Sequence, residues 1–385
     1  MKRKICVFIG GRANYSSIKS AMQAIQAHPD LTLQVVLGGS GLVDKFGDLE
    51  NILKKDGFEI DEKVYMQVEG DKPNAMVKTA GLGMLGLADV YERLEPDFVI
   101  VIGDRYEVMA ATIAAAYMNI RVAHTMGGEV TGTIDESIRH AITKFAHVHF
   151  PANKEAAERI LKLGEKENDV FTVGCPRIDN IKRILDADSS MPMDLYETEG
   201  GVGPKFDLSE PFILVSQHSV TTEYTDAKEQ ITETIKACMR TGKNIIMLWP
   251  NADAGSEGIS TGIRRYREMY PDAKLHVFKN MPISVYVRLM KNTACLVGNS
   301  SSGIREGAFI GTPCVNVGTR QNGRERGSNV IDAADEENAI YEAIMKQIEH
   351  GPYESEPIYG DGHAGERIAD ILSKVDVEVQ KMITY

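Results

Sequence analysis

The sequence lacks the features that mark membrane, secreted and disulfide-rich proteins. It has one tryptophan and 7% aromatic residues, and no apolar run reaches the roughly 18 to 20 residues of a membrane-spanning helix. Its five cysteines stand far apart and form no CxxC pair, so reduced and mostly buried thiols are expected. The chain opens directly into a strand-like run, without a signal-peptide core. These absences predict a soluble cytoplasmic protein with no membrane partner.

Positive charges are outnumbered by negative ones, with 43 lysines and arginines against 55 acidic residues. The formal net charge is -12 at pH 7, which argues against a nucleic-acid partner because a phosphate backbone attracts a basic surface. An acidic protein can still bind an anion where a few cations converge. Arginines that gather at one place are therefore the feature to look for.

Two common nucleotide-binding fingerprints are missing as well. The first predicted strand is followed by Gly10-Gly11-Arg12, which is not G-x-G-x-x-G, and residues 318–325 have P-loop glycine spacing without the Lys-Ser/Thr pair. What remains after the first strand is a glycine turn with an arginine at a helix start. Arg12 could contact an anion there, or the segment could be an ordinary tight turn with a solvated arginine.

The first half of the chain alternates short apolar runs with helical patterns. A length of 385 residues favours two domains. Strands are predicted at 5–9, 31–37, 98–102 and 121–124, with weaker ones at 148–150 and 170–173, between helices at 15–28, 75–94, 107–118, 134–145 and 153–163. This alternation is typical of right-handed crossovers in a parallel sheet.

The alternation stops and then starts again. Residues 186–211 are rich in serine, glycine and proline, which predicts a linker or a long surface loop. Strands follow at 212–216, 244–249, 275–277, 294–298 and 313–317, with helices at 226–241, 259–270, 284–291 and 304–310. We therefore predict an α/β protein with two doubly wound domains, residues 1–185 and 212–361, that face a central cleft. Ligands are expected at the carboxyl ends of the strands.

The strongest phosphate-binding signal follows the strand at 294–298. Gly298-Asn299-Ser300-Ser301-Ser302-Gly303 leads straight into a helix, so backbone N–H groups, the helix dipole and hydroxyls can converge on a diphosphate. Glu306, near the first helical turn, could accept hydrogen bonds from a ribose. A serine N-cap with an acidic first turn is the simpler alternative, but three serines exceed what one cap needs.

A second glycine-framed loop, residues 318–324, carries two arginines. Arg320 lies closer to the preceding strand end than Arg324 does, so Arg320 is the better candidate for neutralising a diphosphate. Either arginine could instead be a surface residue.

Carboxylates follow two strand ends of the first half. Asp104 and Arg105 come directly after the strand at 98–102, and Arg105 could hold phosphate or lower the pKa of the carboxyl group. Glu129 and Asp135 follow the strand at 121–124, in a stretch with three glycines. Asp135 alone could be an ordinary helix-start acid. Three carboxylates at neighbouring strand ends indicate acid–base chemistry.

Histidines occur in two different settings. His218 stands at the end of the strand at 212–216, where an imidazole could bind phosphate or transfer a proton. His147 and His149 alternate on a strand-like stretch, but no acidic ligand pattern accompanies them. We interpret these two as structural residues and predict no metal site.

Taken in order, these segments resemble the sugar-nucleotide 2-epimerase family, and specifically its hydrolysing branch. The resemblance covers essentially the whole chain. It is carried by Arg12-Ala-Asn-Tyr-Ser16, Gly103-Asp-Arg105, Gly127-Gly-Glu-Val-Thr-Gly-Thr-Ile-Asp135, Ser137-Ile-Arg-His-Ala-Ile-Thr-Lys144, Gln217-His218, Pro250-Asn-Ala-Asp-Ala-Gly255, Gly298-Asn-Ser-Ser301, Arg305-Glu306, Gly318-Thr-Arg-Gln321 and Tyr359-Gly-Asp-Gly362.

The resemblance implies a glycosyltransferase-B-like fold, in which two Rossmann-like domains close over UDP and residues 362–385 form a helix that packs back on the first domain. It implies loss of the sugar C2 proton with anti elimination of UDP, then water addition that frees the 2-epimer, a mannosamine-type precursor of sialic or legionaminic acids. No cofactor, metal or nicotinamide is needed, and a dimer or tetramer is implied.

The same resemblance suggests a role for individual residues. Asp104, Glu129 and Asp135 are implied as catalytic acid or base groups, and His218 as a diphosphate contact that could also donate a proton. The implied UDP contacts are Arg12, Ser16, Arg105, His218, Met281, Ser300, Ser301, Gly303, Glu306 and Arg320.

One position departs from the family pattern. Many members carry a glutamate two residues after the histidine of the loop, whereas this chain has Met126 after His124. A methionine cannot transfer a proton, so Glu129 covers the role, or the second step differs, or the substrate does. A 2,4-diacetamido-2,4,6-trideoxy sugar fits this departure better than UDP-GlcNAc. A non-hydrolysing epimerase, a glycosyltransferase of the same fold and a non-catalytic UDP-sugar sensor remain as alternatives.

Overall fold

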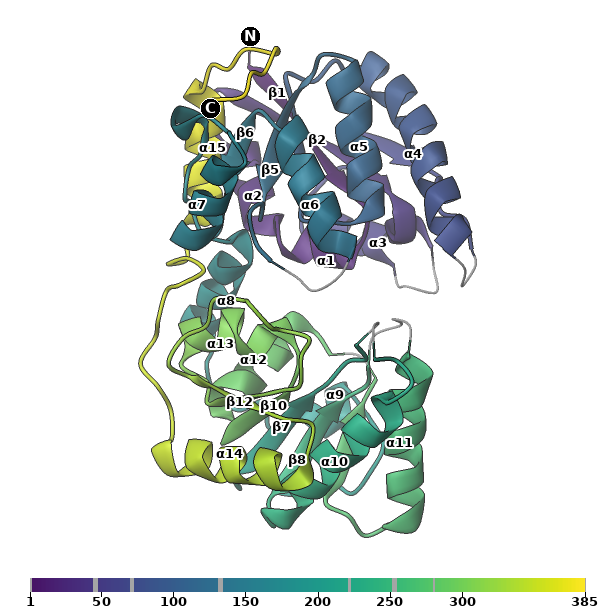
Figure 1. The fold of residues 1–385 in the computed structure, drawn as a ribbon, viewed down its shortest axis with the longest axis vertical. Coiled ribbons are helices and arrows are strands. Elements are labelled where there is room, and N and C mark those ends of the chain that lie inside the picture. The colour runs from purple at the N-terminus through teal and green to yellow at the C-terminus, as the bar shows by residue number, and fades with distance from the viewer. Residues whose placement is uncertain are drawn as a thin grey trace. The chain divides into compact units, whose positions relative to one another are not determined.

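The computed structural model of the chain describes residues 2–43, 48–69, 73–130, 134–220, 223–250, 255–279 and 281–384. The chain forms two compact units. The first contains Met1–Asn180 and Tyr359–Tyr385, and the second contains Ile181–Ile358 (Figure 1).

The first unit is built on a parallel sheet of six strands in the order β3-β2-β1-β4-β5-β6. Its strands are β1 (Arg3–Ile9), β2 (Leu31–Gly38), β3 (Glu62–Val64), β4 (Phe98–Ile102), β5 (Arg121–Thr125) and β6 (Val148–Phe150). This is the Rossmann strand order, in which the connection reverses direction between β1 and β4. The carboxyl ends of those two strands are where such a sheet binds ligands.

Helices cover both faces of this sheet, which explains why its strands are nearly continuous apolar runs. Ile5 and Val7 of β1 pack on one face with helix residues such as Met22, while Cys6 and Phe8 pack on the other. The helices are α1 (Arg12–Ser16), α2 (Lys19–Ala27), α3 (Leu49–Lys55), α4 (Pro73–Leu94), α5 (Tyr106–Tyr117), α6 (Ile134–Phe145), α7 (Lys154–Lys162), α8 (Pro176–Ala187, which runs into the second unit) and α15 (Ala364–Lys374), with 3-10 turns η1 (Gly39–Leu42) and η3 (Glu167–Asp169).

The second unit repeats the plan with a six-stranded parallel sheet in the order β12-β11-β10-β7-β8-β9. Its elements are β7 (Phe212–Ser216), β8 (Asn244–Leu248), β9 (Leu275–Phe278), β10 (Cys295–Gly298), β11 (Cys314–Val317), β12 (Val330–Ala333), α9 (Leu195–Thr198), α10 (Ala227–Arg240), α11 (Ser256–Met269), α12 (Ile283–Asn292), η4 (Ser301–Gly303), α13 (Arg305–Ile310) and α14 (Glu337–His350). The reversal here falls between β7 and β10. The prediction of two Rossmann-like halves is confirmed.

Some predicted elements need correction. The predicted linker, 186–211, belongs to the second unit, because Leu195, Tyr196 and Leu208 are buried in one of its cores. The weak strand at 170–173 is only an isolated bridge between Val170 and His149, although Phe171 and Val173 also donate to the carbonyls of His149 and Pro151. The helix predicted at 15–28 is split into α1 and α2.

After Ile358 the chain returns to the first unit, where α15 packs beside α2 (Figure 1). The buried Asp179 carboxylate accepts hydrogen bonds from the backbone N–H groups of Ala364 (3.0 Å) and Gly365 (2.7 Å) and from the Ser20 hydroxyl (2.8 Å). A carboxylate at a helix N-terminus satisfies otherwise orphan donors. Asp179 therefore joins three helices of the unit.

All five cysteines are buried and unlinked, as expected. Among the described residues, no helix combines the length and apolarity required to span a bilayer.

Candidate active site

In the second unit, the predicted phosphate-binding residues lie at the strand reversal. The Asn299 side chain, which follows β10, accepts a hydrogen bond from the backbone N–H of His218 and donates one to the carbonyl of the same residue, both at 2.8 Å. His218 follows β7. The buried amide therefore ties together the two strand ends between which a Rossmann-like sheet binds its ligand.

A close approach of backbones sets the serine turn. Gly298 has φ 133°, and a side-chain carbon there would lie 2.2 Å from the Ser216 carbonyl oxygen, so only glycine fits. The Ser300 N–H then donates to the same carbonyl at 3.2 Å. The Ser300 and Ser302 hydroxyls are 2.9 Å apart, and Ser302 also contacts the Tyr286 hydroxyl at 2.7 Å. Ser302 is thus used inside the protein, while Ser300 and Ser301 are half-exposed.

A cation and an imidazole stand beside this turn. Arg320 donates from Nη1 to the Asn299 carbonyl at 3.1 Å, and Gln321 donates to the same oxygen at 2.9 Å. Burial, with a contribution from the charge of Arg320, lowers the pKa of His218 to about 4. The His218 imidazole is therefore neutral near neutral pH in the ligand-free protein.

The remaining second-unit candidates are placed around the same turn. Glu306 is buried in the first turn of α13. Gly303 must be small, because a side-chain carbon there would lie 2.4 Å from the Cys314 sulfur. Met281 is half-buried against the hydrophobic core just before α12. The quoted motif residues 251–254 lie outside the described residues.

In the first unit, the strand reversal lies between β1 and β4. The buried Asn14 side chain donates to the Ile102 carbonyl at 3.2 Å and so joins α1, which follows β1, to the end of β4. Arg12 is exposed at the first position of α1, and the Ser16 hydroxyl donates to the Ala13 carbonyl at 3.0 Å. Both candidates thus belong to the loop and short helix after β1.

The Asp104 carboxylate is paired with a buried arginine. Arg139 of α6, only 3% exposed, donates from Nη2 to Asp104 and from Nη1 to the Glu129 carbonyl at 2.7 Å. A neighbouring guanidinium favours the ionised form of a carboxyl group. The structure therefore brings Asp104 and the Glu129 backbone to one arginine.

Arg105 has its own carboxylate partner. Its Nε atom donates to the buried Glu107 carboxylate at 2.8 Å. Burial disfavours the charged guanidinium, but negatively charged neighbours, Glu107 first, more than offset that cost and raise the pKa of Arg105. The charge of Asp135, at the start of α6, adds to this stabilisation, so Asp135 lies close enough to act on the same cation.

The loop after β5 is held in an unusual conformation. Met126 has φ 63°, which costs a non-glycine residue about 1–2 kcal/mol, and its side chain packs against the hydrophobic core. Gly128 has φ 75°, and a side-chain carbon there would lie 2.1 Å from the Ala156 carbonyl oxygen. Glu129 is 1% exposed. Residues 131–133 lie outside the described part of the chain.

Sequence reasoning missed Arg139 and Asn299 as organising residues. Both stand inside the motifs that carried the family resemblance, but neither was given a role. The spacing of Asp135 and Arg139, four residues apart on one helix, is the signal that could have placed the arginine beside the acids. Asn299 gives no comparable signal, because its two hydrogen bonds depend on a strand distant in sequence.

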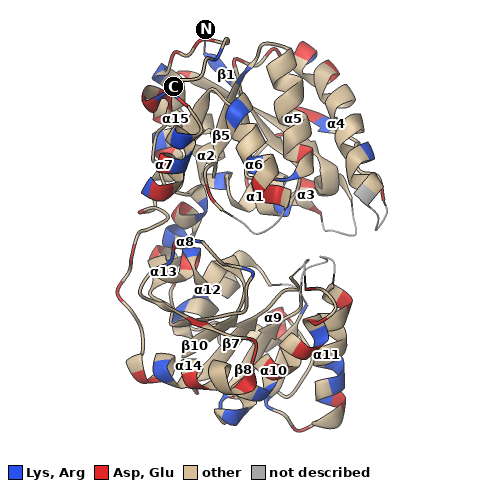
Figure 2. Ribbon diagram, in the orientation of Figure 1, with Lys and Arg blue, Asp and Glu red and all other residues tan. Residues whose placement is uncertain are grey.

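The described residues contain no group of three or more histidine, cysteine or acidic side chains arranged to hold a metal. Lysine and arginine are interspersed with acidic residues on the helices of each unit (Figure 2). The arginines that are candidates for anion binding are Arg12, Arg105 and Arg320, which follow strands of the two sheets.

Comparison with solved structures identifies the fold. The chain aligns with a UDP-GlcNAc 2-epimerase from Neisseria meningitidis, solved bound to UDP-GlcNAc, with a TM-score of 0.79 and 18% identity over 96% of this chain and 99% of the other. The fold is thus the glycosyltransferase-B-like pairing of two Rossmann-like sheets.

Sequence similarity is more specific. The chain is 34% identical to UDP-N,N'-diacetylbacillosamine 2-epimerase (hydrolyzing) from Legionella pneumophila over 99% of this chain and 98% of that protein. It is 30% identical to UDP-N-acetylglucosamine 2-epimerase from Neisseria meningitidis serogroup B over 97% and 95%. The UDP-N-acetylglucosamine 2-epimerase family profile matches residues 23–373, and the chain belongs to that family.

Proposed function

We propose that the protein is a hydrolysing 2-epimerase that converts a UDP-activated N-acetylated amino sugar to UDP and the free 2-epimer. UDP-N,N'-diacetylbacillosamine is the preferred substrate, and UDP-GlcNAc is the second candidate. The product is then a mannosamine-type sugar of the kind used to build sialic or legionaminic acids. Membership of the UDP-N-acetylglucosamine 2-epimerase family supports the general reaction.

One observation carries the proposal. Each sheet has candidate residues at or next to its own strand reversal: Asp104 follows β4 in the first unit, and the serine turn, the candidate anion-binding turn, follows β10 in the second. Removal of a sugar proton needs a base, and departure of a nucleotide diphosphate needs groups that stabilise negative charge. The proposal assigns these two tasks to the two units.

In the proposed first step, the Asp104 carboxylate takes the proton from C2 of the sugar. The electron pair forms a C1–C2 double bond, and the C1–O bond to the β-phosphate breaks on the opposite face. Arg139 keeps the carboxylate ionised and aimed before reaction. General base catalysis of this kind contributes about 10²- to 10⁴-fold to a rate.

In the proposed second step, water adds to C1 of the glycal and a proton is delivered to C2 from the other face. Asp135 and Glu129 are the candidate relays: the carboxylate takes a proton from the attacking water and passes it to C2, while Asp104 releases its proton to solvent. Asp135 stands near Arg105 at the start of α6, and Glu129 follows the glycines of the loop after β5. In the complete reaction, the UDP sugar and one water molecule are converted to UDP and the free 2-epimer.

The departing UDP is assigned mainly to the second unit. Ser300, Ser301 and Arg320 supply hydroxyls and a positive charge, while Glu306 is proposed to bind the ribose. Because its pKa is lowered to about 4, His218 enters the reaction neutral and donates one hydrogen bond to the diphosphate. Arg320 is the cation of this set.

Two observations favour the hydrolysing reaction on a diacetamido sugar. The Legionella relative, similar over nearly the whole chain, is named for that activity. In addition, Met126 occupies the position of the usual glutamate, which separates this chain from the plain UDP-GlcNAc pattern.

The proposal is tested by incubating the protein with each UDP sugar in ¹⁸O-labelled water and analysing the separated products by mass spectrometry. We expect unlabelled UDP and a free 2-epimeric sugar, because the C1–O bond breaks and UDP keeps its oxygen atoms. A UDP-linked epimer would support the non-hydrolysing alternative. Labelled UDP would indicate cleavage at phosphorus and contradict the elimination step.

A further inference from the structure

Arg139 connects two parts of the first unit that the proposed chemistry must hold together. It lies on α6, buried, and its two terminal nitrogens reach the Asp104 carboxylate after β4 and the Glu129 carbonyl after β5. The planar, five-donor guanidinium can make both contacts at once in a fixed geometry. A lysine carries all its donors on one nitrogen, so it cannot place a separate nitrogen on each of these two acceptors.

A second set of contacts ties the same helix to the same strand end. The buried His124 donates from Nε2 to the Gly103 carbonyl at 2.8 Å, directly before Asp104. Since a carbonyl only accepts, Nε2 carries the proton and Nδ1 is free to accept. The Thr143 hydroxyl of α6 lies 3.3 Å from that Nδ1. Burial lowers the pKa of His124 to about 3, so this neutral arrangement holds throughout the physiological range.

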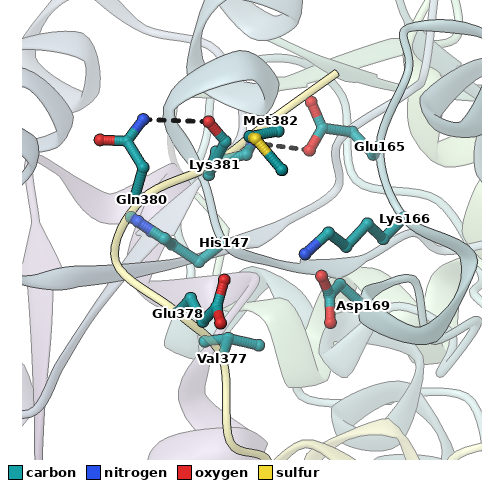
Figure 3. A pocket seen from close by; sticks show the side chains of 9 residues that line it. All are labelled: His147, Glu165, Lys166, Asp169, Val377, Glu378, Gln380, Lys381 and Met382. Carbon is teal, nitrogen blue, oxygen red and sulfur yellow. Dashed lines mark hydrogen bonds and ion pairs between the residues drawn. The ribbon is translucent and has the colours of Figure 1, made fainter. Parts of the chain in front are cut away.

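The far end of α6 is fixed by the C-terminal tail. The Lys381 ammonium donates to the carbonyls of Lys144 (2.9 Å) and Ala146, which the helix leaves without an intrahelical partner, and pairs with Glu165 at 2.6 Å. Figure 3 shows Lys381 and Glu165 facing each other beside His147. The recess there is about 20 Å³, room for one water.

We propose that Arg139 is the positioning residue of the reaction: it aims the Asp104 carboxylate and fixes the loop that carries Glu129. It touches neither substrate nor leaving group in this role and acts through its two partners. The part that concerns catalysis rests on the proposed function, whereas the ordering of the loop does not. Both can be measured.

The test compares Arg139→Lys and Arg139→Ala with a matched control, Arg159→Lys. Arg159 of α7 donates to the Gly128 carbonyl of the same loop at 3.2 Å and to the Glu155 carboxylate of its own helix at 3.3 Å. A misplaced catalytic group costs about 100-fold. We expect kcat to fall about 100-fold in both Arg139 variants, with the KM and the calorimetric affinity for UDP changed less than about threefold. The control should keep most of its kcat.

Chemical rescue separates positioning from folding. Millimolar guanidinium chloride should restore at least about tenfold of the lost kcat to Arg139→Ala, while sodium chloride at equal ionic strength should not. A shared loss of kcat and UDP affinity without rescue would assign Arg139 a structural role and overturn the proposal. Retention of kcat in Arg139→Lys within about twofold would also overturn it.

Hydrogen exchange gives a readout that needs no turnover. Amide exchange in residues 126–130 should be faster in Arg139→Ala than in the unmodified protein and should slow again on adding guanidinium. Unchanged exchange would contradict the proposal even if the protein turned over neither UDP sugar. Wild-type protein that turns over neither sugar, but shows the exchange effect, would sink the proposed function and leave the positioning of the loop standing.

Discussion

At the scale of single residues, the candidate site contains two carboxylates that are paired with arginines. Asp104 has Arg139, and Arg105 has Glu107. In each pair a partly exposed group meets a buried one. The buried partner is held in place by packing, so the pair has one geometry. Such preorganisation is what a base needs before substrate arrives.

Asp104→Asn should abolish exchange of the C2 proton, because an amide has the shape of the carboxylate but cannot accept a proton. Loss of a general base is expected to lower kcat by about 10²- to 10⁴-fold. The affinity for UDP, measured by calorimetry, should stay within about threefold, since Asp104 is not among the candidate UDP contacts. Asp89→Asn, at an exposed position of α4, is the control. Retained turnover in Asp104→Asn would remove this residue from the mechanism.

The candidate site residues were largely predictable from the sequence where they directly follow a strand. Asp104, His218 and Ser300 were placed from short apolar runs followed by polar residues. Arg139 and Asn299 were not, because their importance comes from contacts between segments far apart in the chain. The positive φ of Met126 was also unpredictable, since only the packing of the loop imposes it.

At the scale of elements, α6 links the site to the C-terminal tail. Its first turn carries Asp135, its middle carries Arg139, and its last carbonyls meet Lys381. Three parts of the unit therefore fix the helix along its length.

Lys381→Met should destabilise the first unit by about 1–3 kcal/mol, because the last α6 carbonyls lose a charged donor and Glu165 loses one of its partners. Such a change lowers the melting temperature by about 2–4 °C per kcal/mol in a domain of this size. Scanning calorimetry gives the measurement, with Lys374→Met, at an exposed end of α15, as the control. Equal melting temperatures for the two variants would show that the tail contact is dispensable.

The elements themselves were predicted unevenly. Long apolar strands and amphipathic helices were recognised because both faces of each sheet are covered. The edge strands β3 and β12, with partly polar sequences, were missed, and so were α3, α8 and α14. Residues 186–211 lack periodicity, yet isolated apolar residues such as Leu195 and Leu208 anchor them in a core. Apolar residues that are buried singly give no periodic hydrophobic pattern in the sequence.

At the scale of the whole molecule, buried neutral histidines make stability sensitive to acid. Burial lowers the pKa values of His124, His147 and His149, to about 3 in the case of His124. The unfolded chain binds these protons at about pH 6.5. Between the two pKa values the unfolded state holds more protons, so stability falls as the pH falls.

Stability of the first unit should therefore decrease from about pH 7 to about pH 5, above the range in which carboxylates titrate. His124 alone should contribute about 2 kcal/mol of this loss at about pH 5. Melting temperatures measured across the interval, with His124→Gln beside the unmodified protein, test the account. The glutamine amide can still donate to Gly103 but cannot titrate, so its slope should be shallower. Equal slopes would exclude His124 as the source.

The central claim is that this chain removes the C2 proton of a UDP sugar and releases the sugar as its free 2-epimer. The most direct measurement is proton NMR of the protein with UDP-N,N'-diacetylbacillosamine in heavy water, without any acceptor. The account predicts UDP and a free 2-epimeric sugar that carries deuterium at C2. A free 2-epimer that keeps its original C2 proton, or a free sugar of unchanged configuration, would contradict it.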